Sequence, residues 1–415
     1  MHNNDESNDA ANASKFNSFI LSALEPYQWC FAYFGLMAPP PFFSSNKQTK
    51  CKTILQRLLY VMYSLVLLSI TICATYINNA YISDDIAKDD LDVITAILDI
   101  GQSISVTVIQ MILQMTALLG YRQLCNFLVA IVKLEEEIQW HCNMLAATDR
   151  QSKRRYSLRR RLALHTGILI VFLFIVMPRV QFALLIKTMP FIYKMFTVFS
   201  GIMIQIGSVQ FCVFVEVIHE MLLQLEENML LLRHEFVKPA DGNVSLQKML
   251  YESLQANQNL LARVWHLVGT IERYYSLPMF VLLFNNSLVI LHISNWIYLD
   301  SSEPFNYYQG GFIAIMILNM LVPCWLSQIC INTYNRFGTL LHNLRTDDLD
   351  IVLSMRLKEY SLQLMHQKIV FSCGGFFDFN LRNFGALLLT IIMYIVIMIQ
   401  FKLQSDPNAS TKQSR

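Results

Sequence analysis

The sequence predicts an all-α membrane protein with seven transmembrane helices. Hydrophobic residues make up 54% of its 415 residues and charged residues only 15%, whereas soluble domains carry about 25% charge. With 14 Gly and 11 Pro, the chain has too few turn residues for the many short alternating strands of a β-barrel. A spanning helix needs about 20 apolar residues. Seven runs meet this length: residues 58–81, 93–119, 162–185, 196–218, 277–299, 311–333 and 384–401.

The distribution of Lys and Arg indicates how these spans are oriented. Residues 47–57 carry four basic side chains before the first span, and residues 84–92 carry five Asp and one Lys after it. The densest basic run, seven Lys or Arg within residues 150–161, precedes the third span and falls on the same side. Because basic flanks stay in the cytoplasm, we expect a cytoplasmic N-terminus and an extracellular C-terminus. Three basic residues on the predicted outer side count against this orientation: Arg179, Lys187 and Lys194.

The later spans differ from one another in regularity. Pro178 and Arg179 interrupt the third span, which is the least regular of the seven.

Apolar residues at helical spacing continue beyond the fourth, fifth and sixth spans, so we expect these helices to extend into the cytosol and build an intracellular base. The sequence thus divides into a cytoplasmic N-terminal region, a six-helix sensing bundle, a cytosolic connection, a last helix and a short extracellular tail: residues 1–57, 58–333, 334–383, 384–401 and 402–415.

Composition and motifs argue against several classes of function. The net charge of +2 is too small for the basic face of a nucleic-acid-binding protein. The HExxH, GxSxG, P-loop and GxGxxG patterns are missing from the sequence, and its nine His show no metal-ligand spacing. We therefore expect neither an enzyme nor a metal site, and no cofactor.

The last span carries a distinct pattern. Tyr394 is followed by five apolar residues and then by Gln400 and Phe401. This resembles the C-terminal signature of insect gustatory receptors, in which Thr usually stands where this chain has Met393. The run of glycines and aromatic residues at positions 374–380 also resembles the segment before the last helix in that family. The residue-level resemblance is concentrated in roughly the last 40 positions, and the seven-span topology extends it over the chain.

The resemblance implies a function and a place in the cell. The family is similar in architecture to insect odorant receptors, which are tetrameric ligand-gated cation channels whose last helices line a central pore. It implies a tastant-gated, non-selective cation channel subunit, multi-pass in the plasma membrane of sensory neurons. The implied partners are a small-molecule tastant, other subunits of the family in a tetramer, permeating cations and the lipid bilayer. Sugars, bitter compounds and cuticular compounds all stay open as ligands. Because most members of the family are assigned to bitter or otherwise aversive compounds, the resemblance favours that class.

The resemblance also assigns roles within the last helix. It implies that Gln400 is a pore or gate residue and that Met393 and Ile397 form apolar constrictions, which close a pore by excluding water. From the residues alone, the favoured role of Gln400 is a hydrogen bond between helices, which contributes about 0.6 kcal/mol in membranes.

Polar residues at membrane depth indicate where a ligand could bind, because such groups are unfavourable there unless they are paired or face a cavity. The resemblance implies a pocket that opens to the outside, and aromatic walls with a few polar groups suit small molecules, so together they favour the outer half of the fifth span. For each residue, hydrogen bonding between helices is the competing interpretation, and Trp296 also fits an anchor at the membrane interface. The candidates come from the second, fifth and sixth spans: Asp99, Gln102, His292, Asn295, Trp296 and Asn319.

Two other classes of seven-span or multi-span protein remain as alternatives. A G-protein-coupled receptor is disfavoured by the predicted extracellular C-terminus and by the lack of Asp-Arg-Tyr after the third span and of Asn-Pro-x-x-Tyr in the seventh. A secondary transporter typically has repeated halves and spans broken by Gly or Pro. Neither feature is apparent in this sequence.

Overall fold

The computed structural model describes eight segments of the chain, and all structural statements below concern them. The N-terminal region before residue 18, the tail after residue 405 and the intervening loops lie outside the described residues. These include most of the predicted extracellular connection before the sixth span. The described segments are residues 18–39, 50–88, 93–145, 150–184, 190–236, 244–299, 307–344 and 351–405.

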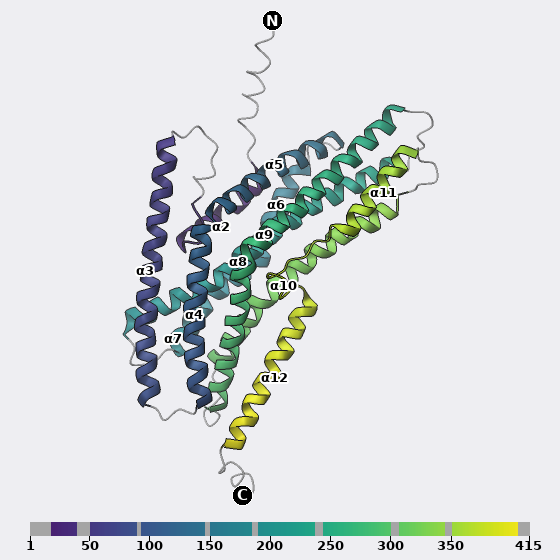
Figure 1. The fold of residues 1–415 in the computed structure, drawn as a ribbon. Coiled ribbons are helices and arrows are strands. Elements are labelled where there is room, and N and C mark those ends of the chain that lie inside the picture. The colour runs from purple at the N-terminus through teal and green to yellow at the C-terminus, as the bar shows by residue number, and fades with distance from the viewer. Residues whose placement is uncertain are drawn as a thin grey trace.

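The described residues are almost entirely helical, and seven helices among them are long and apolar enough to cross a membrane. This confirms the predicted all-α fold with seven candidate spans (Figure 1). Shorter helices complete the described chain: α2 (Phe19–Tyr33), α5 (Tyr121–Leu145) and α11 (Ile351–His366). The spans are α3 (Lys50–Lys88), α4 (Val93–Leu119), α6 (Arg150–Val171) with η3 (Phe172–Val176) and α7 (Met177–Leu184), α8 (Phe191–Phe236), α9 (Val244–Leu299), α10 (Tyr307–His342) and α12 (Leu381–Ser405).

The irregular third span crosses as one distorted helix. A π-helical turn, η3, lies directly before Pro178 in α7. Proline lacks an N–H and its ring clashes with the carbonyl four residues earlier. A wider turn accommodates this clash without ending the helix. The interruption noted in the sequence is therefore a local widening of the helix.

Three spans continue far beyond the thickness of a membrane. α9 has 56 residues, which at 1.5 Å per residue extend about 84 Å, whereas a hydrocarbon core is about 30 Å thick. α8 and α10 are also long, with 46 and 36 residues. Their extensions gather with α5 and α11 at the end of the molecule opposite to the end of α12 (Figure 1). The predicted helical extensions are confirmed, and we call this region the base.

The core of the described structure surrounds α8. In the most apolar stretch of α8, 83% of the residues are buried, compared with 17% in α3 and α12. A helix that is apolar on all sides is stable in the centre of a bundle, and α8 contacts α3, α4, α5, α6, α9 and α10. By contrast, α12 contacts α9 and α10 at the periphery. The last helix therefore exposes most of its apolar surface.

Candidate functional site

A tight turn joins the base to the last helix. Within this connecting turn (residues 371–380), Ser372 and Asp378 form an antiparallel bridge. Gly374 and Gly375 have φ values of 58° and 79°, in the left-handed region that glycine adopts without strain. The side chain of Asn380 accepts a hydrogen bond of 2.7 Å from the N–H of Asn383, as an N-cap does. The Gly-Gly and Asn of the family-like run thus fix where α12 begins.

Aromatic side chains attach this turn to the centre of the bundle. The ring of Phe379 lies 5.2 Å from that of Phe211 on α8, and Phe371 lies 6.2 Å from the same ring. Phe377 packs on Phe379 at 5.6 Å. Phe211 is almost completely buried. The beginning of α12 is therefore held against the buried core around α8.

The last helix is buried on one side and exposed on the opposite side. Its packing face, which includes Ile391, Met398 and Lys402, is buried against the bundle. Met393 and Ile397 are 58% and 40% exposed, and Gln400 is also exposed. At about 100° per residue, these three residues form one stripe on the side opposite to the packing face, and we call it the open face. The structure places the three predicted pore residues together and directs them away from their own bundle.

Tyr394 and Phe401 of the C-terminal motif share a third side of the same helix. They are 57% and 59% exposed, and their spacing of seven residues places one above the other. Aromatic rings exposed beside an open stripe are suited to contacts with another chain or with lipid. Tyr394 and Phe401 therefore flank the open face and leave the packing face to other side chains.

Five side chains of α4 and α9 form a polar ladder near the ends of these helices: Thr95, Asp99, His292, Asn295 and Trp296. Asn295 donates a hydrogen bond of 2.9 Å to Oγ1 of Thr95, and Nε1 of Trp296 donates to Oδ1 of Asp99 at 3.4 Å. Nδ1 of His292 lies 2.9 Å from Oδ1 of Asp99, although the ring is not aligned for a hydrogen bond. The structure therefore brings together four of the six predicted ligand-binding residues.

Helical spacing explains why these residues meet. Thr95 and Asp99 are four residues apart on α4, and His292, Asn295 and Trp296 follow at i, i+3 and i+4 on α9, so each set occupies one face. Asn295 and Thr95 are fully buried, whereas the side chains of Asp99 and His292 are 11% and 19% exposed. Asp99 is accordingly paired with Trp296 and His292. Oδ1 of Asn295 has no hydrogen-bond partner among the described residues.

The two other predicted ligand-binding residues lie outside the ladder. Gln102 is half-buried on α4, three positions beyond Asp99. Asn319 belongs to a separate buried network, in which its Nδ2 donates to Oε1 of Gln205 on α8. Nε2 of Gln205 donates in turn to Oδ1 of Asn286 at 3.0 Å. Asn319 therefore has the partners expected of a residue that joins helices.

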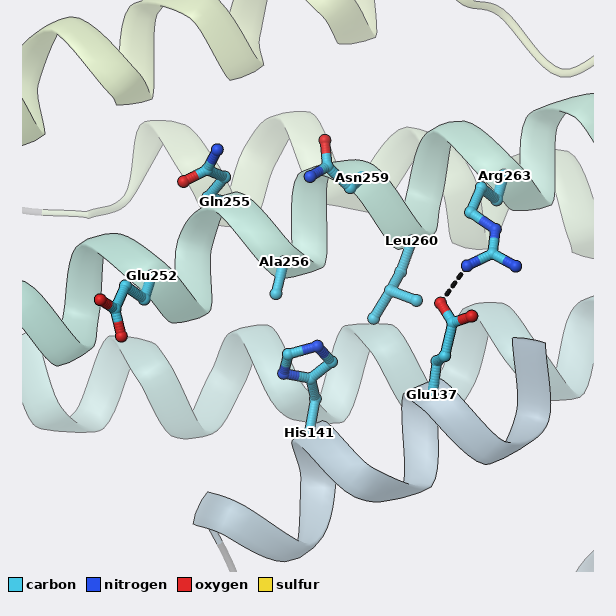
Figure 2. A pocket seen from close by; sticks show the side chains of 8 residues that line it. All are labelled: Glu137, His141, Glu252, Gln255, Ala256, Asn259, Leu260 and Arg263. Atoms are coloured by element: carbon cyan, nitrogen blue, oxygen red, sulfur yellow. Dashed lines mark hydrogen bonds and ion pairs between the residues drawn. The ribbon is translucent and has the colours of Figure 1, made fainter. Parts of the chain in front are cut away.

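An open cleft of about 380 Å³ lies in the base, between α5 and α9 (Figure 2). Glu137 of α5 pairs with Arg263 of α9 at one end, and Glu252 lies toward the other. The His141 ring lies between these ends, and burial lowers its pKa from the ordinary value. The side chains of Glu137, Arg263 and Glu252 are 47%, 43% and 63% exposed. A polar, shallow cleft of this kind differs from the apolar enclosure that small organic ligands prefer.

A buried charge cluster between α6 and α8 did not emerge from the sequence. Arg161, the last residue of the dense basic run, pairs with both Glu216 and Glu220. His165 Nδ1 lies 3.3 Å from Glu216, and His219 lies at 3.8 Å. The signal was present, because Glu216 at the end of the predicted fourth span and Glu220 one turn beyond it are two acids on one helical face that require a partner. Arg161 thus has a structural role in addition to any role of the basic run in topology.

Comparisons with known proteins place the chain in a family. The sequence profile described as 7tm chemosensory receptor matches residues 24–405. Gustatory receptor 98b of Drosophila melanogaster is 32% identical, over 94% of this chain and 96% of its own. Gustatory receptor 98c of the same insect is 30% identical, over 93% and 95% of the two chains.

Solved structures agree with the fold. The insect olfactory receptor OR5 of Machilis hrabei superimposes with a TM-score of 0.60 at 13% identity, over 92% of this chain and 99% of its own. Its complex with eugenol gives a TM-score of 0.57 at 12% identity over the same shares. Members of this family are chemoreceptors and not enzymes. The chain therefore belongs to the 7tm chemosensory receptor family, as a relative of the insect gustatory receptors.

Proposed function

We propose that this chain is a subunit of a tastant-gated, non-selective cation channel in the plasma membrane of sensory neurons. Its N-terminus is cytoplasmic, its C-terminus is extracellular, and four subunits surround a central pore lined by α12. Membership of a chemoreceptor family and the fold shared with an insect olfactory receptor support the general role. The arrangement of α12 supports the role as a channel.

The observation that carries the proposal is the open face of the last helix. Met393, Ile397 and Gln400 form a stripe opposite to the packing face. The start of their helix is held against α8 by the contact between the preceding turn and Phe211. An apolar helix that only faced lipid would gain nothing from a polar amide on that stripe. In a ring of four subunits, Gln400 lines the pore, and Met393 and Ile397 form constrictions that exclude water when closed.

The base supports assembly of the subunits. α11 exposes an apolar side that has no cover within the described part of the chain: Ile351, Val352, Met355, Leu362 and Met365. Apolar patches of this kind mark protein–protein contacts. In the proposed tetramer, these side chains pack against neighbouring subunits in the cytosol. The ring is then held together away from the membrane, and the last helices are free to move relative to one another.

The ligand site lies at the polar ladder. Asp99, His292 and Trp296 combine an acid, a base and an aromatic wall in partly exposed positions, and Gln102 extends this surface along α4. The olfactory receptor OR5 was solved with eugenol, which supports a small organic ligand for this fold. Asn319 lies deeper and acts through the packing of α8 and α10. Ligand binds the open state better and shifts the equilibrium between closed and open channels.

The decisive experiment is whole-cell recording from cells that express this chain alone, with a tastant panel applied outside and G-protein signalling blocked. A rapid cation current supports the proposal and identifies a ligand class. A response that disappears with the G-protein block supports a G-protein-coupled receptor instead. An epitope after residue 405 tests the topology, since labelling of intact cells is expected only with an extracellular C-terminus.

A further inference from the structure

We infer that Lys402 is a positioning residue of the last helix, which ties the end of α12 to the polar ladder through Thr95. The inference rests on the proposed channel function and concerns how ligand binding reaches the pore. Nζ of Lys402 donates a hydrogen bond of 3.1 Å to Oγ1 of Thr95. The two residues are 307 positions apart in the chain, so this contact joins the last helix to the beginning of α4.

The burial of Lys402 is unusual for its position. Lysines at the ends of membrane helices normally extend their ammonium group toward water. Lys402 lies three residues before the end of α12 and is only 7% exposed. Its side chain lies on the packing face, opposite to the open face that carries Gln400. The ammonium group therefore stays out of the proposed pore mouth and is used for a contact with the bundle.

Thr95 connects this contact to the ladder. Its Oγ1 accepts from both Nζ of Lys402 and Nδ2 of Asn295. Asn295 lies beside Trp296 and one turn from His292, which both contact Asp99. A ligand that separates or tightens α4 and α9 at Asp99 alters the position of Thr95 and Asn295 together. The hydrogen bond of Lys402 transmits this displacement to α12. The polar ladder and the last helix therefore switch together between two arrangements, as one two-state element.

The test compares three variants of the last helix by agonist dose–response and single-channel recording. Lys402→Met keeps the length of the side chain and removes the ammonium group, so the half-maximal agonist concentration should shift about tenfold. Lys402→Arg restores a donor and should stay within about threefold of the wild type. Leu403→Met, an exposed position of the same helix that lies on neither the packing face nor the open face, is the control and should leave the dose–response unchanged.

Conductance separates positioning from an effect on permeating ions. Because Lys402 lies on the packing face, Lys402→Met should leave single-channel conductance unchanged. A changed conductance with an unchanged dose–response would place the ammonium group in the ion path and overturn the inference. If Lys402→Met changed neither the dose–response nor the conductance, the inference would also be overturned.

A double-mutant cycle tests the link through Thr95. Thr95→Val removes the hydroxyl at constant volume, and its effect on agonist sensitivity should be strongly non-additive with that of Lys402→Met. The control cycle pairs Lys402→Met with Ser105→Ala. Ser105 lies deeper on α4, and its substitution removes a hydrogen bond to Asn285 on α9. The effects of these two substitutions should be additive. Additive effects in the Thr95 cycle would contradict a shared element.

Cross-linking tests the contact without any current. In membranes, the pair Thr95→Cys and Lys402→Cys should be joined by a short bifunctional thiol reagent and detected by peptide mass spectrometry. Either substitution alone is the control. Failure of the pair to cross-link overturns the inference whatever the channel does, whereas a cross-linked chain that never carries current counts against the proposed function and leaves the contact established.

Discussion

Nε of Arg161 on α6 lies 2.9 Å from Oε1 of Glu216 on α8, and the side chain of Glu216 is only 1% exposed. Arg161 also pairs with Glu220, whose side chain is 4% exposed. One guanidinium group therefore compensates two buried carboxylates between α6 and α8. Removing one partner of a buried pair leaves a charge without compensation, which is far more destabilising than losing an exposed pair.

We predict that Arg161→Met lowers the free energy of unfolding by about 3 kcal/mol. The neighbouring Arg160 is exposed, so Arg160→Met is a matched control and should change stability by less than about 0.5 kcal/mol. Thermal unfolding in detergent measures both. Adding Glu216→Gln to Arg161→Met should recover part of the loss, and the absence of any recovery would show that packing, not charge, explains the effect.

A second prediction concerns pH and the N-terminal helix α2. Glu135 on α5 is 1% exposed and accepts hydrogen bonds from the N–H groups of Phe19 and Ile20 and from the side chains of Ser18 and Gln139. Burial raises the pKa of Glu135 above its ordinary value, and these hydrogen bonds oppose the increase. Because the folded pKa exceeds the unfolded value of about 4.3, the contribution of this group is complete below about pH 4.3 and is lost as pH rises through the folded pKa.

The measurement is the unfolding temperature of the wild type and of Glu135→Gln between about pH 4 and 7. The variant cannot titrate at this position, so the stability of the wild type relative to the variant should fall with rising pH. Glu136→Gln, an exposed neighbour, should show no such trend. A difference that grows with pH would mean that the hydrogen bonds outweigh burial.

A third prediction concerns the connecting turn. A Cβ on Gly374 would lie 3.0 Å from Oγ of Ser276, whereas a Cβ on Gly375 would meet nothing within 4 Å. Both substitutions to Ala incur the strain of a positive φ, about 1 kcal/mol, but Gly374→Ala adds a close contact. Gly374→Ala should therefore be the more destabilising of the two in thermal unfolding. Adding Ser276→Ala should remove this excess and leave Gly375→Ala unaffected.

Much of the fold follows from the sequence, because hydropathy is a local property. The seven spans and the extension of α8, α9 and α10 could be predicted from runs of apolar residues and their helical spacing. The pairing between helices could not. His292 and Asp99 are nearly 200 positions apart, and nothing in their own surroundings specifies which neighbour each helix packs against.

The candidate pore shows the same limit. The resemblance named Met393, Ile397 and Gln400 as pore residues, but the sequence did not indicate which side of the helix packs on the bundle. That side is determined by α9 and α10, which hold Ile391 and Met398. Asn319 is the opposite case, since its polarity attracted attention and its partner Gln205 accounts for it.

The last prediction concerns the sign of a charge at Gln400. If this residue lines a cation pore, a positive side chain opposes permeating ions and a negative one attracts them. A unit charge near the ion changes its energy by on the order of 1 kcal/mol at an intermediate effective dielectric, which corresponds to several-fold changes in conductance. Gln400→Arg should therefore reduce cation conductance or abolish it, Gln400→Glu should raise conductance or the relative permeability of divalent cations, and Gln400→Ala should fall between them.

The opposite signs of Arg and Glu serve as mutual controls in single-channel recordings from channels with matched surface expression. A Gln400 that packs against lipid or a neighbouring helix would be disturbed by either charge, so both variants would then lose surface expression or current together. Effects of opposite direction on permeation therefore distinguish a pore-lining amide from one that joins helices, and equal effects of the two charges would remove Gln400 from the ion path.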